Sequence, residues 1–301
     1  MRMGAFRSPP NPFGEKKGKD KMRVRITADS TCDLSPELLR KYDIALAPLS
    51  VIIDGKVFHD GVDVTPRDIF RAAEAGKSVR TAAVNTYEYK EFFREQLKSC
   101  DQLVHICIGS GFSTCYADAC EAAAEVENVY AVDSQNLSTG SGLLALEGFD
   151  LAATGMKGEE IATVLSRKTG LIDTSFVVRT IDYLRRGGRC SGLEALGAKM
   201  LHIRPSIVVK DGKMRPGDKY RGRYEHYLKH YIQDTLANDQ TIDFRRVFIT
   251  HSPSEEGLVR FAIDTVKSYG LFREVLETMA GCTVCTHCGP DTLGLMFARK
   301  G

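Results

Sequence analysis

The chain has 301 residues, of which 43% are hydrophobic and 27% are charged, and these values are typical of a globular protein with one or two domains. The formal net charge is only +2, so the sequence lacks the strong field that attracts nucleic acid or an anionic membrane surface. No apolar run approaches the ~20 residues that cross a bilayer, and we therefore expect neither a nucleic-acid partner nor stable insertion into a membrane.

The first 21 residues are rich in Gly, Pro and Lys and contain no apolar segment of the kind found in secretory signals. Because such a segment cannot bury a core, we expect residues 1–21 to form a disordered leader. The nine cysteines are spread over alternating predicted strands and helices, and an odd number so placed is not a disulfide framework. This cysteine usage predicts a reducing compartment, the cytoplasm.

Predicted strands and helices alternate over residues 22–169. The helix starts are clear signals, because Ser35 and Thr65 each precede a proline and Asn85 precedes Glu88 by three positions. The expected elements are a strand at 22–29, helices from Ser35 and Thr65, apolar runs at 44–49 and 50–57 with an Asp54-Gly55 turn in the second, a helix from 85 to about 97, a strand at 103–108, an Ala-rich helix after Ser113, a strand at 129–133, and helices at 141–153 and 159–168. The alternation predicts an N-terminal α/β domain with a mostly parallel sheet and helices on both faces.

Gly170 marks the expected boundary to a second domain over residues 170–301. The expected elements there are a strand at 174–178, a helix from Ile181, a helix near 193–202, a hairpin of 205–210 and 213–219 around Asp211-Gly212, a helix at 224–236, a strand at 246–251, a helix at 255–269, and strands around 274–284 and 293–298. Because hairpins are mixed with crossover connections, this half predicts a mixed α/β domain.

Two hydroxyl-bearing segments precede predicted helices: Thr81 lies in residues 79–82, and Ser113 lies in residues 109–114 directly after a predicted strand. The first N–H groups of a helix have no internal partner and the helix dipole favours negative charge, so such a turn can bind an anion. Turns that follow parallel strands share one edge of the sheet, and we expect these two turns to meet there with the Asp133-Ser134 turn. Ser, Thr and Asp are also common in turns and caps, which leaves a structural role open for each.

A catalytic interpretation of Ser113 is the first alternative. Residues 111–115 come close to the nucleophile elbow G-x-S-x-G, and His287 follows late in the chain, as in a hydrolase triad. Cys115 stands where the elbow needs a small residue, so the match is incomplete. A serine esterase or lipid hydrolase remains an alternative on the residues alone.

A cysteine cluster and two Gly/Arg turns complete the candidate sites. Cys282, Cys285 and Cys288 are spaced as C-x-x-C-x-x-C, but no fourth Cys or second C-x-x-C pair follows. If the segment is a strand, Cys285 points away from the other two, and we predict buried thiols that bind no metal. The Gly/Arg turns at 187–189 and 221–223 could hold phosphate or carboxylate, or could be solvated surface turns.

Taken together, these residues resemble the DegV family, the fatty-acid-binding subunits of bacterial fatty acid kinases, over about residues 23–299. The resemblance rests on segments 26–34 (family D-S-T-x-D-L), 48–51, 109–116 (S-S-G-L-S-G-T-Y), 183–189 (Y-L-K-K-G-G-R), 286–290 (H-T-G-P-G) and 293–295. Two departures stand out. Residues 81–85 keep the Thr of the family's T-S-Q-P-S but not its polar neighbours, and Thr114 replaces the glycine after the binding serine.

The resemblance implies two α/β domains with one long-chain fatty acid buried between them. It implies that Thr81 and Ser113 bind the carboxylate with His287 close by, and that Arg189 and Arg221 engage the kinase subunit. The chain has no Walker A motif and no G-x-G-x-x-G between a strand and a helix, so a carrier without catalytic residues or cofactor is expected, with nucleotide chemistry on the partner. A subunit like that of dihydroxyacetone kinase, holding a small polar ketone near a His, is the other alternative.

Overall fold

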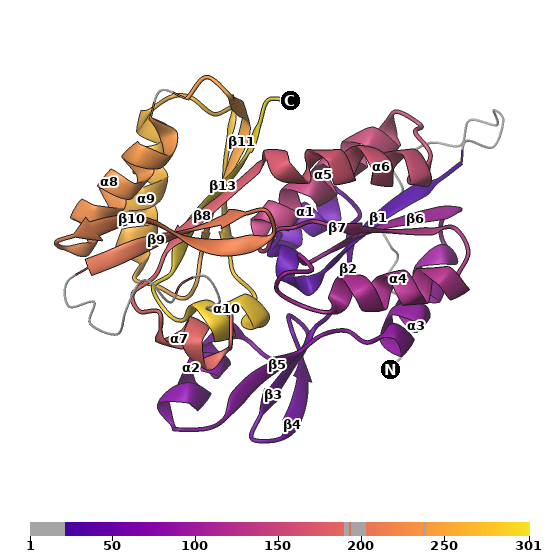
Figure 1. Cartoon of the computed structure of the whole chain (residues 1–301), viewed down its shortest axis with the longest axis horizontal. Helices are drawn as coiled ribbons and strands as arrows, with labels where there is room; N and C mark the ends of the chain where they lie inside the picture. The colour runs from indigo at the N-terminus through magenta and orange to yellow at the C-terminus, as the bar shows by residue number, and fades with distance from the viewer. Residues whose placement is uncertain (1–21, 190–192, 194–202, 238) are drawn as a thin grey trace, which may run out of the picture.

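The computed structural model describes residues 22–189, 193, 203–237 and 239–301 (Figure 1). The expected leader at 1–21 and all but Leu193 of the expected helix at 193–202 lie outside the described residues. Within the described ranges, no helix combines the length and apolar character that crossing a membrane requires.

A four-stranded parallel sheet, in the order β2-β1-β6-β7, organises the N-terminal half. Its strands are β1 Val24–Asp29, β2 Ala45–Ala47, β6 Gln102–Cys107 and β7 Val129–Asp133. The helices around it are α1 Pro36–Lys41, α3 Thr86–Leu97, α4 Cys115–Glu125, α5 Thr139–Ala153 and α6 Gly158–Lys168. Figure 1 shows α3 and α4 below the sheet and α5 and α6 above it. This arrangement confirms the parallel sheet with helices on both faces, and β6 is buried at every position, as a central strand requires.

The helix starts follow the local sequence. Ser35 caps α1 by accepting a hydrogen bond from the Leu38 N–H. Thr65 with Asp68 and Asn85 with Glu88 form reciprocal capping boxes at the starts of α2 (Pro66–Glu74) and α3. These caps explain why helices began where the sequence predicted.

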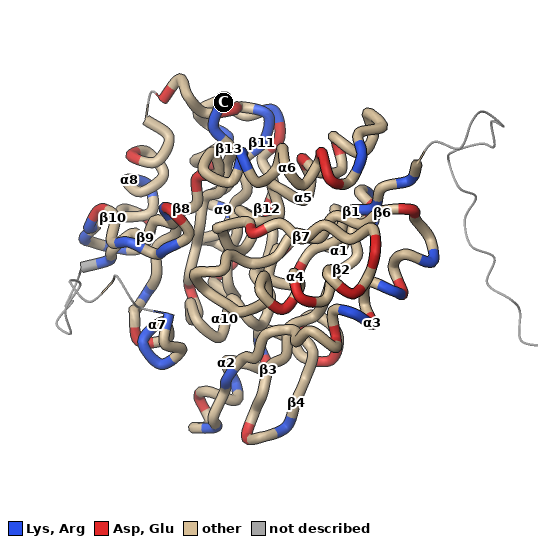
Figure 2. The backbone as a smooth tube through the Cα atoms, turned by 45° about the vertical axis from the view of Figure 1, so that its right-hand side comes forward, with Lys and Arg blue, Asp and Glu red and all other residues tan. Residues whose placement is uncertain are grey.

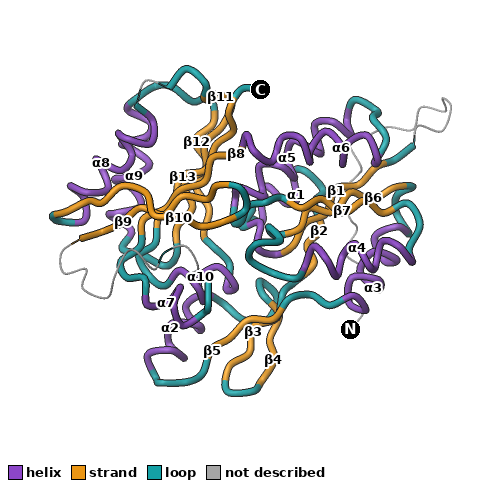
Figure 3. The backbone as a smooth tube through the Cα atoms, viewed as in Figure 1, coloured by secondary structure: helices purple, strands orange, loops and turns teal. Residues whose placement is uncertain are grey.

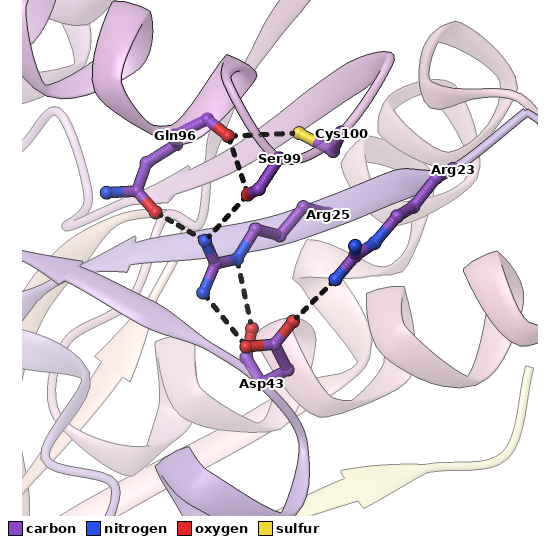
Figure 4. Close-up of polar contacts among 6 residues, drawn as sticks. All are labelled: Arg23, Arg25, Asp43, Gln96, Ser99 and Cys100. Carbon is purple, nitrogen blue, oxygen red and sulfur yellow. Dashed lines mark hydrogen bonds and ion pairs between the residues drawn. The ribbon is translucent and has the colours of Figure 1, made fainter. Parts of the chain in front are cut away.

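A group of hydrogen bonds fixes the start of β1 at the end far from its Asp29-Ser30-Thr31 turn (Figure 4). Arg25 Nη2 donates to Asp43 Oδ1 (2.9 Å) and Arg25 Nη1 donates to Gln96 Oε1 (2.7 Å), which joins β1 to the end of α1 and to α3. The Asp43 side chain is 58% exposed, so solvent screening keeps the ion pair's contribution to stability small.

A three-stranded antiparallel sheet, in the order β4-β3-β5, forms a separate group of strands at the bottom of Figure 3. Its strands are β3 Ser50–Ile53, β4 Lys56–His59 and β5 Val79–Ala82. The expectation that Thr81 occupies a turn at the edge of the parallel sheet is wrong, because Thr81 lies within β5 and pairs with Val51 of β3. The following helix begins only behind the Asn85 cap, so residues 79–82 are free to pair as a strand.

The C-terminal half contains a six-stranded mixed sheet in the order β10-β9-β8-β13-β11-β12. Its strands are β8 Ile172–Val177, β9 Ile203–Lys210, β10 Lys213–Arg221, β11 Ile242–His251, β12 Glu274–Met279 and β13 Leu293–Arg299. Helices α7 Asp182–Arg186, α8 Tyr224–Leu236, α9 Glu256–Ser268 and α10 Cys282–Cys288 accompany it. The predicted hairpin is confirmed: β9 and β10 pair around Asp211-Gly212, where both residues have positive φ.

The expected strand at 274–284 is partly wrong, because β12 ends at Met279 and α10 begins at Cys282. Gly281 has an extended backbone and starts the helix, and a carboxylate from the N-terminal half binds the first helical N–H groups. Asp60 accepts from the N–H of Cys282 (2.6 Å) and of Thr283 (2.9 Å). These partners lie more than 200 positions away in the sequence, so local patterns could not indicate the helix.

Because the cysteine segment is helical, the argument from opposite strand faces does not apply to it. Cys282 Sγ donates to the Val64 carbonyl and Cys285 Sγ donates to the Ala280 carbonyl. Burial raises the pKa of the Cys282 and Cys285 thiols and raises the pKa of Cys288 to about 12, so all three stay protonated at neutral pH. That the three cysteines bind no metal stays a prediction, and elemental analysis for zinc and iron is its test.

The two halves share a core. One cluster of buried apolar side chains joins Leu137 and Ile108 of the first half to Phe176, Met214 and Cys288 of the second. A short 3-10 turn, Thr169–Leu171, connects α6 to β8. We keep residues 22–169 and 170–301 as a proposed division into domains.

Candidate functional site

The structure brings four of the five predicted site residues to one small cavity of about 50 Å³. Thr81 comes from β5, Ser113 from the turn before α4, His287 from α10 and Arg189 from the turn after α7. Most of the remaining lining is apolar: Leu49, Ala82, Ala83, Ile108, Phe112, Leu137, Met214 and Val284. Arg221 does not line this cavity; it is the last residue of β10 and is exposed.

His287 and Thr81 form the best-defined contact of the cavity, with 2.8 Å between Nε2 and Oγ1. Burial, with a smaller effect from Arg189, lowers the pKa of His287 to about 4, so the imidazole is neutral at pH 7. Its Nδ1 has no hydrogen-bond partner among the described residues and faces Gly187. A proton on Nδ1 would find no acceptor there, which favours the tautomer with the proton on Nε2. In that tautomer His287 donates to Thr81, and the Thr81 hydroxyl proton is free for a ligand.

Ser113 is held by its own turn. Its Oγ accepts from the Cys115 N–H (3.3 Å) and lies 3.1 Å from Cys115 Sγ, to which it donates. Sulfur is a weak acceptor, so the Ser113 hydroxyl can turn toward a carboxylate at little cost. A nucleophilic serine needs a base within hydrogen-bond reach, but His287 pairs with Thr81 instead. This geometry favours a binding role over the nucleophile of a hydrolase.

A second cavity, of about 20 Å³, adjoins the first and shares Leu137, Val284 and Cys288 with it as lining residues. Phe176 and Met296 add apolar surface to its lining. Both cavities are far smaller than the ~300–1,000 Å³ of ordinary ligand pockets. A long acyl chain can therefore enter only if lining side chains move, which the flexible methionines permit.

A larger pocket of about 430 Å³ lies on the outer side of the same polar residues and shares Thr81, Arg189 and His287 with the first cavity. Its lining includes Lys77, Arg80 and Arg186, and none of the described residues that line it is acidic. Figure 2 shows where Lys and Arg lie along the backbone of α7 and α2, together with the acidic residues of these helices. We call it the basic pocket, and its chemistry suits a phosphate or another multiply charged anion.

Arg189 is one of three residues that line both the small cavity and the basic pocket. Its Nε donates to the Phe112 carbonyl (3.2 Å) and its Nη1 donates to the Gly187 carbonyl (2.8 Å). These bonds orient the guanidinium and leave further N–H groups for an anion. Sequence reasoning found Arg189 but missed Lys77 and Arg80. These two residues adjoin the site only because β5 belongs to the small antiparallel sheet and not to the parallel one.

Two buried acidic side chains hold α10, and therefore His287, against the N-terminal half. Asp60 binds the first N–H groups of the helix, and Asp33 Oδ1 accepts from the Gly281 N–H (2.8 Å). Burial raises the pKa of Asp33 to about 8, although hydrogen bonds from Ser138 and Gly281 oppose the shift. Both residues were missed as site residues; Asp33 lies in the 26–34 motif, but no sequence signal points to its contact with Gly281.

Among the described residues, one group of three potential metal ligands has its atoms within 4.8 Å of one another: Asp29, His105 and Cys107. The Asp29 carboxylate already binds the Tyr89 hydroxyl (2.5 Å), His105 Nε2 (3.1 Å) and the Ile108 N–H (2.8 Å). This network joins β1, α3 and the end of β6 beneath the Ser113 turn. These hydrogen bonds give the buried Asp29 carboxylate its partners, so the network has a structural explanation.

The fold and site together define a class: a mixed α/β protein with three sheets and a small, mostly apolar cavity that hydroxyl and imidazole groups line. Residues 23–300 match the family model described as "Uncharacterised protein, DegV family". The chain belongs to the DegV family, as the sequence motifs predicted.

Relatives of known sequence and structure cover nearly the whole chain. A DegV domain-containing protein of Caldanaerobacter subterraneus is 31% identical over 282 residues, which cover 92% of this chain and 99% of the relative. A fatty acid-binding protein of Thermotoga maritima is 29% identical, with 91% and 96% covered. A solved structure described as fatty acid binding of a DegV family protein from Thermus thermophilus has a TM-score of 0.84 at 26% identity, with 92% and 100% covered. A stearic acid-binding protein from Eubacterium ventriosum has a TM-score of 0.78 at 26% identity, with 92% and 98% covered.

Proposed function

We propose that this protein binds one long-chain fatty acid, with the carboxylate at Thr81, Ser113 and His287 and the acyl chain in the two apolar cavities. One observation carries the proposal: hydrogen-bonding side chains from three separate elements meet at one small, mostly apolar cavity in the core shared by the two halves. The relatives named for fatty acid binding support it.

The energetics suit tight binding. A saturated long chain has about fourteen methylenes, and burying them at ~0.8 kcal/mol each contributes roughly 11 kcal/mol before the costs of association and of opening the cavities. An ionised carboxylate cannot be buried without partners. Thr81 and Ser113 supply charge-assisted hydrogen bonds, and the neutral His287 keeps the Thr81 hydroxyl correctly oriented.

We further propose that the carboxylate is presented to a separate fatty acid kinase, which phosphorylates it to an acyl phosphate. We call the small cavity lined by Thr81, Ser113 and His287 the head-group cavity. The basic pocket supports this step, because it shares Arg189 with the head-group cavity and its cationic side chains suit the phosphoryl group during transfer. Arg189 and the exposed Arg221 remain the proposed contacts with that partner. In this proposal the protein is a carrier without catalytic residues or a cofactor.

Two alternatives predict different results. An esterase would need Ser113 beside a base, and the pairing of His287 with Thr81 disfavours it. A small polar ketone, as in a dihydroxyacetone kinase, would leave the apolar lining of both cavities without a partner.

Lipid extraction and native mass spectrometry of the protein purified from a bacterial host test the proposal directly. We expect one copurifying long-chain fatty acid, and a rise in melting temperature when palmitate is added to delipidated protein. Absence of both would overturn it. Ester hydrolysis by the parent that Ser113→Ala abolishes would replace the carrier with an esterase.

A further inference from the structure

One polar side chain in the head-group cavity is not explained by the motifs or by the fold. Thr283, the second residue of α10, lines the cavity together with Thr81, Ser113 and His287. Its side chain is buried, with only 5% of the residue exposed. In the described structure its Oγ1 has no hydrogen-bond partner, although its backbone N–H donates to Asp60.

The place of Thr283 in the helix explains the unpaired hydroxyl. A helical threonine commonly donates to the carbonyl one turn earlier, as Thr286 does to Cys282 (2.8 Å). Thr283 has no earlier turn, because Gly281 begins the helix and Met279 still belongs to β12. The hydroxyl must therefore find a partner outside its own helix or remain unpaired.

Thr283 and His287 are separated by four positions, so their side chains lie one turn apart on the same face of α10. A ligand group held beside His287 is thus within reach of Thr283. A buried hydroxyl without a partner is destabilising, and each such group in a folded protein requires an explanation.

We propose that Thr283 Oγ1 is a third hydroxyl donor to the fatty acid carboxylate, and that the bound ligand supplies its missing partner. A carboxylate offers about four lone-pair sites, enough for Thr81, Ser113 and Thr283 together. The inference rests on the proposed function and adds a residue that binds the head group.

The test compares Thr283→Val, which keeps the side-chain shape, with Thr283→Ser, which keeps the hydroxyl. Delipidated proteins are titrated with palmitate and with methyl palmitate. We expect Thr283→Val to weaken palmitate binding roughly ten- to a hundredfold and Thr283→Ser to stay near the parent. The affinity for methyl palmitate should fall less in Thr283→Val than the affinity for palmitate does, because a neutral ester accepts weaker hydrogen bonds than a carboxylate.

Thr174→Val is the matched control. Thr174 in β8 is also fully buried with an unpartnered Oγ1, but it does not line the head-group cavity. Both valine variants should melt at or above the parent's temperature without ligand, since each removes an unpaired buried hydroxyl at nearly constant volume. Only Thr283→Val should weaken palmitate binding.

The outcomes separate the two proposals. If the parent binds palmitate and Thr283→Val binds it equally well, Thr283 is not a head-group donor and the carrier function stands. If ligand-free Thr283→Val melts well below the parent, the hydroxyl has a structural partner and the inference is also wrong. If the parent binds no fatty acid, both proposals fail.

Discussion

Gly187 is the position where one added methyl group should disable the site without changing its chemistry. A Cβ built on Gly187 would lie 2.0 Å from His287 Nδ1 and 2.7 Å from its Cε1. The backbone at Gly187 has φ −79° and ψ −4°, which alanine adopts readily. Gly187→Ala therefore acts by contact with the imidazole and not by backbone strain.

The size of the displacement follows from the contact distance. Real Cβ contacts essentially never fall below 3.0 Å, so the ring must move by at least about 1 Å or the end of α7 must shift. Either change breaks the 2.8 Å contact between His287 Nε2 and Thr81 Oγ1. A misdirected Thr81 hydroxyl loses a bond to a charged group worth ~1.5–3 kcal/mol, which is roughly a ten- to hundredfold loss of fatty acid affinity.

Titration with a fluorescent long-chain fatty acid, beside thermal melting, measures this loss. Gly170→Ala is the neutral control, since its added Cβ meets nothing within 4 Å. Gly188→Ala tests strain alone, because Gly188 has φ +67° but also open space around it, and it should lower stability by ~1–2 kcal/mol while keeping affinity. Fatty acid binding by Gly187→Ala equal to that of Gly170→Ala would refute the role given to His287.

Three further predictions follow from the same contacts. Ser113→Ala and Thr81→Ala should each weaken palmitate binding by about ten- to a hundredfold in calorimetric titrations while the protein stays folded, whereas Ser166→Ala on α6, whose hydroxyl bonds only its own helix, should bind like the parent. The pKa of His287 is lowered to about 4 from an ordinary value near 6.5, so the unfolded chain binds more protons and stability should fall as pH drops from about 6.5 to 4; urea melts of His287→Gln should lack this component. The pKa of Asp33 is raised to about 8, so its contribution to the free energy of unfolding should be complete below about pH 4 and be lost as pH rises toward 8. Asp33→Asn should remove this loss. If urea melts of Asp33→Asn showed the same dependence of stability on pH as the parent, the burial argument would be wrong.

Local sequence was sufficient wherever a local interaction decides the structure. Capping residues such as Ser35 and Asn85 satisfy helix N–H groups within three positions, and the Asp211-Gly212 turn adopts positive φ by itself. The helix at 224–236 and the strand at 129–133 also have the bounds that their sequence patterns predicted. The motifs also identified the DegV family. They pointed to Thr81, Ser113 and His287, which the fold brings to one cavity, and the binding role of these residues stays a prediction.

What the sequence could not determine depends on partners far away along the chain. Residues 79–82 become a strand outside the parallel sheet because β3 offers an antiparallel edge, and that pairing places Thr81 opposite His287. Residues 282–288 become a helix because Asp60 satisfies its first N–H groups across a separation of 222 positions. The helical form puts Thr283 on the same face as His287 and leaves its hydroxyl unpaired, which no periodicity could indicate. The sequence by itself therefore determined the local elements and the family, whereas long-range hydrogen bonds decided the geometry of the site, because only folding brings those donors and acceptors together.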